Sequence, residues 1–399
     1  METDTGSPAG PPPLAGLRVL DFSRVLSGPF AGRMLADLGA DVVKVEPPEG
    51  DVTRYWGEVR HGLSGFYTQQ NAGKRNVCID LKTEAGRHLA HRLCERADIV
   101  IENYRPGVFA RLGLTYDSLS SANPGLILLA ISGFGATGPD RDRPAYATVI
   151  QAESGLVSRQ AECDAVAPTD PLISLADMNA ALHGLVAVLS AVVLRQRTGQ
   201  GQYIDLSMLD AMLVTDDYAH HALDRSPLVR MGGEFWDAPG GPVLLAGDFR
   251  HLWRQLSSVH GLVDPTPPDA DVPTKAASRR SIVGDWLRSF DDREKMTSAL
   301  DAANLAWADV RDHRTTFDQP SVEARRMVAE VDDRGGGTRR IVESPYRFSS
   351  AAAGVRGPAP YRGEHNREVL ADWVGLDDDA VEAALQAGAL LAEDRPAGG

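Results

Sequence analysis

The chain has 399 residues and a net charge of −14, with 43% hydrophobic and 24% charged residues. These values are typical of a globular protein with an ample core, and the length favours two or three domains. The negative charge argues against nonspecific binding to nucleic acid or to an anionic membrane, so an anionic ligand would need a local basic pocket.

The N-terminal segment METDTGSPAGPPP has no apolar core and no basic start, which argues against a signal peptide and predicts a disordered lead-in over residues 1–13. The three cysteines, Cys78, Cys94 and Cys163, lack metal-like spacing, so no metal site is predicted. Their odd number favours a reduced compartment, and we expect a cytoplasmic protein. The longest apolar stretch, 180–194, is too short and too interrupted to predict a membrane span.

Residues 14–50 predict a strand, a helix and a second strand. The strands are expected at Leu17 to Phe22 and at Asp41 to Glu46, with the helix from Gly28 to Leu38 between them. Such a unit implies a parallel sheet. The dinucleotide-binding pattern GxGxxG is absent from the first turn, which argues against a nicotinamide or flavin cofactor.

The same alternation continues to residue 135. Further strands are predicted at 76–80, 98–102 and 126–132, and helices at 83–95 and up to residue 112. In open α/β sheets, ligands bind outside the carboxyl ends of the strands. The loops after residues 22, 102 and 132 fit this rule, although glycines and prolines in such loops taken alone more often form simple turns.

Asp177 precedes the longest predicted helix. The apolar run 172–176 predicts a short strand before it, and apolar residues at helical spacing after it predict a buried helix that ends at Gly199 and Gly201. A carboxylate at a strand-to-helix junction is most often an N-cap, which stabilises by about 1 kcal/mol. From spacing alone, a catalytic carboxylate is the less common alternative.

The composition changes after residue 224. Residues 14–224 predict a Rossmann-like α/β domain with a parallel sheet, and 225–335 a smaller α+β domain with a hairpin around Gly240 and Gly241. Residues 336–399 are expected to return to the large domain. The remaining predictions are helices at 147–158, 208–223, 281–300, 366–374 and 378–387, and strands at 204–207 and 340–343.

Six stretches in the same order resemble the family III CoA-transferases, a superfamily that includes formyl-CoA transferase, carnitine CoA-transferase and α-methylacyl-CoA racemase. They cover most of residues 14–215 and, more loosely, the C-terminal part. The stretches are LAGLRVLDFSRVLSGPFAGRMLADLGADVVKVEPPEGD, NAGKRNVCIDLK, DIVIENYRPGVFARLGL, ISGFGATGPDRDRPAYATVIQAESGL, RQRTGQGQYIDLSMLDAM and GEHNREVL.

The resemblance implies that Asp177 matches the catalytic aspartate of the family. Its carboxylate would attack an acyl-CoA thioester to give an aspartyl anhydride, and CoA would then form an aspartyl-CoA thioester before transfer to a carboxylic acid. Acyl-CoA is thus a substrate, and no permanently bound cofactor is expected. The resemblance also implies an interlocked homodimer.

The matching loops suggest four residues that contact CoA. Lys74, Arg75 and Arg105 would bind its phosphates, with Asn103 beside them. For Lys74 and Arg75, a solvated turn is an equally good interpretation without the resemblance.

Departures from the family pattern bear on the subtype. Tyr146 stands where the racemases have a histidine, and a phenol with a pKa near ~10 is a poor proton-exchanging group, so racemisation is disfavoured. Leu26 and Ala147 replace a glutamine and a glutamate of formyl-CoA transferase, which predicts a larger or more apolar acyl pocket. Gly232 and Gly233 align loosely with the mobile glycine run of that enzyme.

Three hypotheses follow. An acyl-CoA:carboxylate CoA-transferase that uses Asp177 is favoured. The alternatives are an α-methylacyl-CoA racemase or epimerase of the same fold, and a non-catalytic CoA-binding homologue that has kept the fold.

Overall fold

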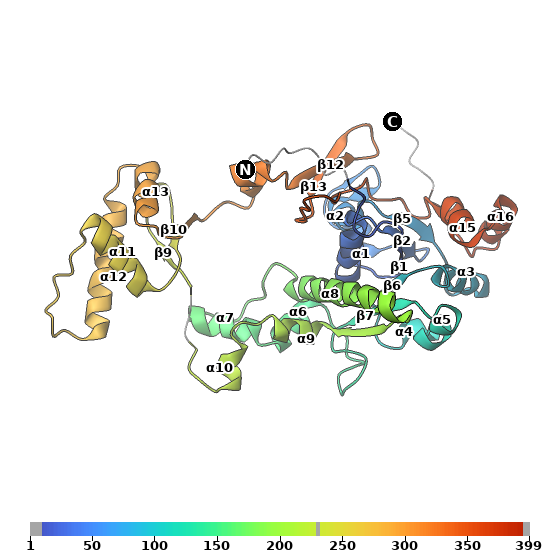
Figure 1. Ribbon diagram of the computed structural model, residues 1–399, viewed down its shortest axis with the longest axis horizontal. Helices are drawn as coiled ribbons and strands as arrows, with labels where there is room; N and C mark the ends of the chain where they lie inside the picture. The colour runs from blue at the N-terminus through green and yellow to red at the C-terminus, as the bar shows by residue number, and fades with distance from the viewer. Residues whose placement is uncertain (1–9, 229–231, 394–399) are drawn as a thin grey trace. The chain divides into compact units, whose positions relative to one another are not determined.

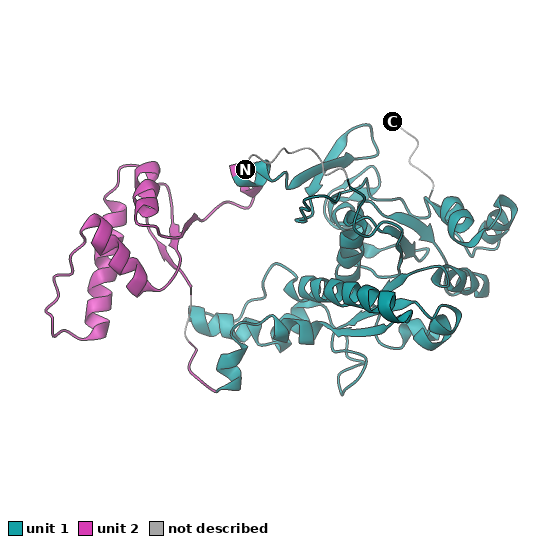
Figure 2. Ribbon diagram, viewed as in Figure 1, with its two compact units in different colours: residues 1–224, 321–399 teal, residues 225–320 magenta. Residues whose placement is uncertain are grey.

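The computed structural model describes residues 10–228 and 232–393. The chain forms two compact units, one of residues 1–224 with 321–399 and one of residues 225–320 (Figure 2). Residues 321–335, which the sequence assigned to the small domain, belong to the first unit. Residues 1–9 of the predicted lead-in lie outside the described residues, whereas the carbonyl of Gly10 accepts a hydrogen bond from the Ala352 amide at 3.3 Å.

A parallel sheet in the order β5-β2-β1-β6-β7-β8 forms the centre of the first unit (Figure 1). Every neighbouring pair of its strands is parallel, which confirms the predicted α/β class. The strands are β1 (Arg18–Asp21), β2 (Asp41–Glu46), β5 (Arg75–Cys78), β6 (Ile99–Glu102), β7 (Ile127–Ser132) and β8 (Tyr203–Ser207).

The strand order reverses between β1 and β6. The chain runs from β1 outward through β2 to β5 and then returns to the other side of β1, where it continues through β6, β7 and β8. The connections after β1 and β6 therefore leave in opposite directions. Such a switch point leaves a crevice at the carboxyl ends of the two strands, which is where ligands bind in open α/β sheets.

Helices cover both faces of the sheet because successive side chains of each strand point to opposite sides. Ile127, Leu129 and Ile131 of β7 belong to one core cluster, and Leu128 and Ala130 belong to the other. The first cluster packs against α1 (Ser27–Asp37), α6 (Ala147–Glu153), α8 (Leu175–Thr198) and α9 (Met208–Val214). The second packs against α3 (Glu84–Cys94), α4 (Val108–Arg111), α5 (Tyr116–Ala122), α15 (Asn366–Val374) and α16 (Asp378–Gln386).

Two predicted helices are each interrupted. The helix expected over 147–158 ends at Glu153, and α7 (Leu156–Asp164) starts after Gly155, whose φ of +83° breaks the helical path. The helix expected over 208–223 divides into α9 and α10 (Ala219–Leu223). The other elements of this unit are η1 (Val52–Tyr55), β3 (Val59–Arg60), β4 (Leu63–Ser64), α2 (Gly65–Asn71), α14 (Pro320–Ala324), β12 (Val328–Asp332) and β13 (Thr338–Val342).

Helix α8 ends at Gly199 as predicted, with φ of +73°, a conformation that glycine adopts without strain. Gly201 allows the backbone to pass close to Leu126, because a Cβ at position 201 would lie 1.8 Å from the carbonyl oxygen of Leu126. With 24 residues and a mean hydropathy of 1.6, α8 is the one helix in the described ranges long and apolar enough to cross a membrane. This test rests on length and composition alone, and α8 packs against α1, α6 and α9 as core helices do.

The second unit has a small antiparallel sheet and three long helices. Strands β9 (Glu234–Trp236) and β10 (Val243–Leu245) form the predicted hairpin around Gly240 and Gly241, and β11 (Trp307–Asp309) pairs with β10. The helices are α11 (Phe249–His260), α12 (Val272–Arg288) and α13 (Arg293–Ala302). The single helix expected over 281–300 is thus divided, since Asp292 caps α13 by accepting the Lys295 amide.

Candidate active site

A cavity of about 420 Å³ lies at the carboxyl ends of β1, β6 and β7, next to the switch point of the sheet. All three loops that the sequence singled out contribute to it. Its lining consists of Arg24, Val25, Ser27, Asn103, Tyr104, Arg105, Pro106, Val108, Ile131, Ser132, Gly133, Arg141, Arg143, Ala145, Tyr146, Asp177 and Met208.

Asp177 reaches this cavity from the first turn of α8. The strand predicted over 172–176 is wrong, because Leu172 and Ile173 are exposed and helix α8 already begins at Leu175. Ser174 is the N-cap, so Asp177 is the third helical residue and not the cap. This position leaves the carboxylate free to face the cavity rather than its own helix.

Ser27, the first residue of α1, lies beside the Asp177 carboxylate in this cavity, and its backbone amide and hydroxyl lower the pKa of that carboxyl. The first amides of a helix have no partner within the helix and favour an anion there. Burial raises the pKa of Asp177, and the Ser27 amide and hydroxyl offset only part of that shift. Asp177 therefore lies between the N-termini of α1 and α8, partly withdrawn from water.

Asn103 connects the loop after β6 to the loop after β1. Its Oδ1 accepts the Arg24 amide at 2.9 Å, and its Nδ2 donates to the Arg24 carbonyl at 2.8 Å and to the Ser27 hydroxyl at 3.2 Å. Since that hydroxyl also lowers the pKa of Asp177, Asn103 contacts the group that lies beside the carboxylate. The predicted site residue is thus present, with its amide engaged in holding the loops.

Four arginines line the cavity: Arg24, Arg105, Arg141 and Arg143. Neither Arg24 nor Arg105 forms an ion pair or a side-chain hydrogen bond with another described residue. Arg143 pairs with Glu153 and lies over the Phe134 ring. Of these four arginines, the sequence analysis predicted only Arg105. Arg24 could have been proposed as well, because it lies in the loop that follows the first strand.

The structure does not bring Lys74 and Arg75 to the cavity. Lys74 is buried, and its Nζ contacts Asp21 and the Pro29 carbonyl, each at 2.8 Å. Arg75 pairs with Asp41 and, through α15, with Glu368 at 3.0 Å and Asp372 at 3.1 Å. Both charges are therefore neutralised within the protein.

Of the five residues predicted to form the acyl pocket, only Tyr146 lines the cavity. Tyr146 lines the cavity and is 66% exposed, whereas Leu26 and Ala147 are each 5% exposed and do not line it. Gly232 and Gly233 belong to the second unit. A Cβ at Gly233 would lie 2.6 Å from the Leu245 carbonyl oxygen, so that glycine permits close packing of backbone within its own sheet.

A second cavity of about 340 Å³ shares Tyr104, Pro106, Ser132 and Arg141 with the first. Glu102 lines it at the end of β6, and burial raises the pKa of this carboxyl to about 8. Its Oε2 accepts a hydrogen bond from the Tyr104 amide at 2.7 Å. The two adjoining cavities provide room for an extended ligand along the ends of the strands.

Comparison with known proteins gives a consistent result. A family model described as CoA-transferase family III matches residues 14–366. The succinate–glutarate CoA-transferase of Agrobacterium fabrum is 32% identical over 94% of this chain and 100% of its own length. The formyl-CoA:oxalate CoA-transferase of Streptomyces avermitilis is 31% identical over 92% of this chain and 97% of its own.

Among solved structures, a CAIB/BAIF family protein from Brucella suis superposes with a TM-score of 0.78 at 30% identity, covering 91% of this chain and 100% of that one. Both the sequence and the backbone therefore agree over nearly the whole length. The resemblance expected from the six sequence stretches is confirmed, and the chain belongs to CoA-transferase family III.

Proposed function

We propose that the protein is an acyl-CoA:carboxylate CoA-transferase in which Asp177 is the covalent nucleophile. The observation that carries this proposal is the partly buried Asp177 carboxylate, which lies beside the first residue of α1, Ser27, in a cavity lined by arginines. A raised pKa makes a carboxylate more basic and hence more nucleophilic, and fixed placement supplies much of what a free carboxylate in water lacks.

The reaction would proceed through two anhydrides. An Asp177 oxygen attacks the thioester carbon, the C–S bond breaks and CoA leaves as a thiolate. The thiolate then attacks the Asp177 carbonyl carbon, which releases the donor acid and leaves an aspartyl-CoA thioester. An acceptor carboxylate attacks this thioester and again frees the thiolate, which takes the acceptor acyl group and restores Asp177. No net proton or electron is required.

The arginines provide the sites for the anionic parts of CoA. Arg105, expected from the sequence, and Arg24, found in the structure, would contact phosphate groups, because a guanidinium presents paired donors to phosphate oxygens. Asn103 would act by holding the Arg24 backbone. Lys74 and Arg75 are not part of this proposal, since their charges are neutralised by carboxylates of the protein.

We further propose that the acyl group carries a second carboxylate. The names of the similar transferases reported above include succinate, glutarate and oxalate, which are dicarboxylic acids, beside the formyl group of formyl-CoA. Arg141 and Arg143 line the same cavity as Asp177, each paired with an exposed acid that a ligand carboxylate could replace, while the apolar Leu26 and Ala147 do not line it. A guanidinium near the acyl end would recognise a distal carboxylate in a bidentate contact.

Covalent trapping tests both proposals. Incubation with succinyl-CoA followed by hydroxylamine or borohydride should modify Asp177, detected by mass spectrometry of its peptide. Butyryl-CoA, which has the same chain length and lacks the distal carboxylate, should modify it at least about 10-fold more slowly if one charged hydrogen bond is lost. An unmodified Asp177 with a panel of acyl-CoAs would refute the covalent mechanism, and tight CoA binding without modification would indicate a non-catalytic homologue.

Racemisation finds less support in the site. The cavity lining contains no histidine among the described residues, and Tyr146 is the titratable group nearest in sequence to the expected position. Exchange of the α-proton of an acyl-CoA in deuterated water, without transfer of CoA, would favour the racemase instead.

We propose that the functional form is an interlocked homodimer. Leu182, Val186 and Val193 of α8 are 46%, 64% and 56% exposed and follow one stripe at helical spacing. Such a stripe on a core helix is typical of a surface covered by another chain. Light scattering should give twice the chain mass, and Val186→Glu should lower the dimer fraction while Gln196→Glu on the same helix should not. A monomeric wild-type protein would contradict the proposal.

A further inference from the structure

The short loop between β1 and α1 contains a backbone conformation that its sequence disfavours. Val25 has φ of +68°, in the left-handed region, which β-branched side chains rarely adopt. Residues held in this region persist when the surroundings over-determine them, and they are common at functional sites. Two residues later, Ser27 lines the cavity beside Asp177, whose pKa its amide and hydroxyl lower.

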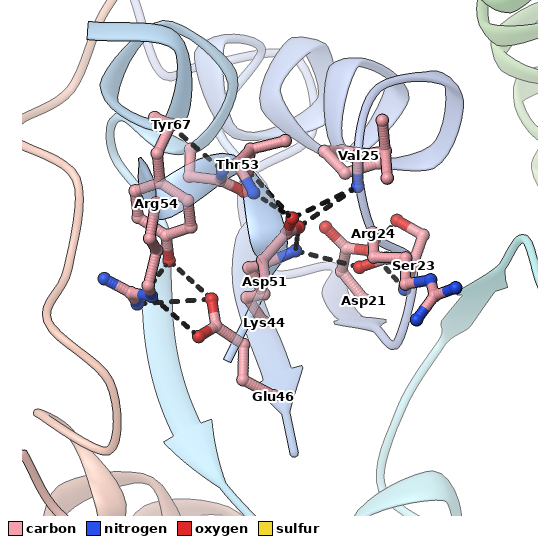
Figure 3. Close-up of polar contacts among 12 residues, drawn as sticks. Asp21, Ser23, Arg24, Val25, Lys44, Glu46, Asp51, Thr53, Arg54 and Tyr67 are labelled. Atoms are coloured by element: carbon pink, nitrogen blue, oxygen red, sulfur yellow. Dashed lines mark hydrogen bonds and ion pairs between the residues drawn. The ribbon is translucent and has the colours of Figure 1, made fainter. Parts of the chain in front are cut away.

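Side chains from other elements bind the backbone of this loop at three successive residues, Ser23, Arg24 and Val25. The Ser23 carbonyl accepts the Lys44 Nζ at 2.8 Å, and Asn103 binds both the amide and the carbonyl of Arg24. The Val25 amide donates to Asp51 Oδ2 at 3.1 Å. Figure 3 shows Asp51 between Val25 and Thr53, with Lys44 beside it. Of these contacts, the hydrogen bond to Asp51 is the one that Val25, the residue with the disfavoured φ, makes with its own amide.

Asp51 is rigidly held. It pairs with Lys44 of β2 at 3.2 Å, and both side chains are at most 1% exposed. Its Oδ1 accepts the Thr53 amide at 3.0 Å and the Thr53 hydroxyl at 2.8 Å, which caps η1. Burial alone would raise the pKa of Asp51, but the Lys44 ammonium and the Thr53 donors outweigh it and hold that pKa below its usual value. Asp51 is therefore a fixed, ionised acceptor.

We propose that Asp51 is a positioning residue for CoA transfer: it holds Val25 in its left-handed conformation, so that the first amide and the hydroxyl of α1 face Asp177. This inference rests on the proposed role of Asp177. Without the Asp51 contact, Val25 returns to an ordinary conformation and Ser27 turns away from the nucleophile. Asp51 acts through Val25 and Ser27 and does not line the cavity.

The first test compares two buried aspartates. Asp51→Asn should lower kcat by about 10- to 100-fold, the population change expected when the strained conformation loses its support. Asp37→Asn is the matched control, because Asp37 is equally buried, pairs with Arg33 at 3.1 Å and makes no contact with the loop. It should lower the melting temperature while kcat stays within about threefold of wild type. Equal losses of kcat in the two variants would overturn the proposal.

The second test is a rescue. Glycine adopts positive φ without strain, so Val25→Gly should remove the need for Asp51. The effect of Asp51→Asn on kcat should fall to about threefold or less in the Val25→Gly background. A loss of the same size in both backgrounds would show that Asp51 acts only through general stability.

The pH profile gives a readout that stability does not change. The donors of Ser27 lower the pKa of Asp177 against the effect of burial. Loss of these donors in Asp51→Asn should therefore move the acid limb of kcat/KM to higher pH, with the cavity arginines Arg24, Arg105, Arg141 and Arg143 unchanged. An acid limb at the wild-type position would contradict the proposal.

Amide hydrogen exchange tests the contact in the wild-type protein and does not need activity. The Val25 amide should exchange as slowly as amides of the neighbouring sheet, although Arg24 beside it is exposed. Exchange at the rate of an unprotected loop amide would refute the proposal even if Asp51→Asn does not fold. If the wild-type enzyme transfers no CoA but this amide is protected, the proposed function fails and the role of Asp51 in the loop stands.

Discussion

Exchange of Asp177 for asparagine is expected to lower kcat for CoA transfer by at least about 1,000-fold, because the amide lacks the charge and the basicity of the nucleophile. The side chain keeps its size, so binding of acyl-CoA should persist and KM should change little. Initial rates with succinyl-CoA as donor and a dicarboxylic acid as acceptor measure both constants.

Although Asp177→Asn should lower kcat, it should raise the stability of the folded protein at neutral pH. Burial raises the pKa of Asp177 in the folded protein above its value of 3.8 in the unfolded chain. The ionised group therefore opposes folding at neutral pH, and this cost disappears as pH falls below 3.8. Asp177→Asn should melt at a higher temperature than wild type at neutral pH, and the difference should shrink with acidification.

Asp210 offers a matched control. It is the third residue of α9, as Asp177 is of α8, but it is exposed and does not line the cavity. Asp210→Asn should retain activity and lose the stabilisation of a carboxylate in a first helical turn, about 0.3–1 kcal/mol. An active Asp177→Asn variant, or one that loses activity together with its fold, would contradict the assignment of the nucleophile.

Replacement of both Arg24 and Arg105 by glutamine is expected to raise KM for acyl-CoA by about 100-fold or more. Each guanidinium faces the cavity without an ion-pair partner among the described residues, and a hydrogen bond to a charged group contributes about 1.5–3 kcal/mol. The chemical step does not involve these groups, so kcat at saturating acyl-CoA should be largely retained.

The dependence of KM on ionic strength, together with a surface variant as control, distinguishes a specific phosphate contact from a general effect of charge. The wild-type KM should rise with ionic strength more steeply than that of the double variant, since two charge contacts have been removed. Arg197→Gln, at the exposed C-terminal end of α8, should leave KM and its salt dependence unchanged. An unchanged KM in the double variant would place CoA elsewhere.

The periodic and local features of the chain were predictable from the sequence. The β1–α1–β2 unit, the other parallel strands and the end of α8 at Gly199 follow from apolar alternation and from glycine, which act over a few residues. The order of the six family stretches added the assignment of Asp177 as a candidate nucleophile. The strand predicted over 172–176 was wrong because a short apolar run has the same sequence pattern whether it is buried or exposed, and Leu172 and Ile173 are exposed.

The α/β class, the family and the residue types at the ends of the strands could all be predicted from the amino-acid sequence. Which charges are available for a ligand became known only from the folded chain. Lys74 and Arg75 are neutralised by Asp21 and by acids of α15, far away in the chain, whereas the guanidinium of Arg24 has no ion-pair partner among the residues that the structure describes. Pairing and burial depend on distances between remote segments, and these are fixed only when the sheet brings the ends of β1 and β6 together.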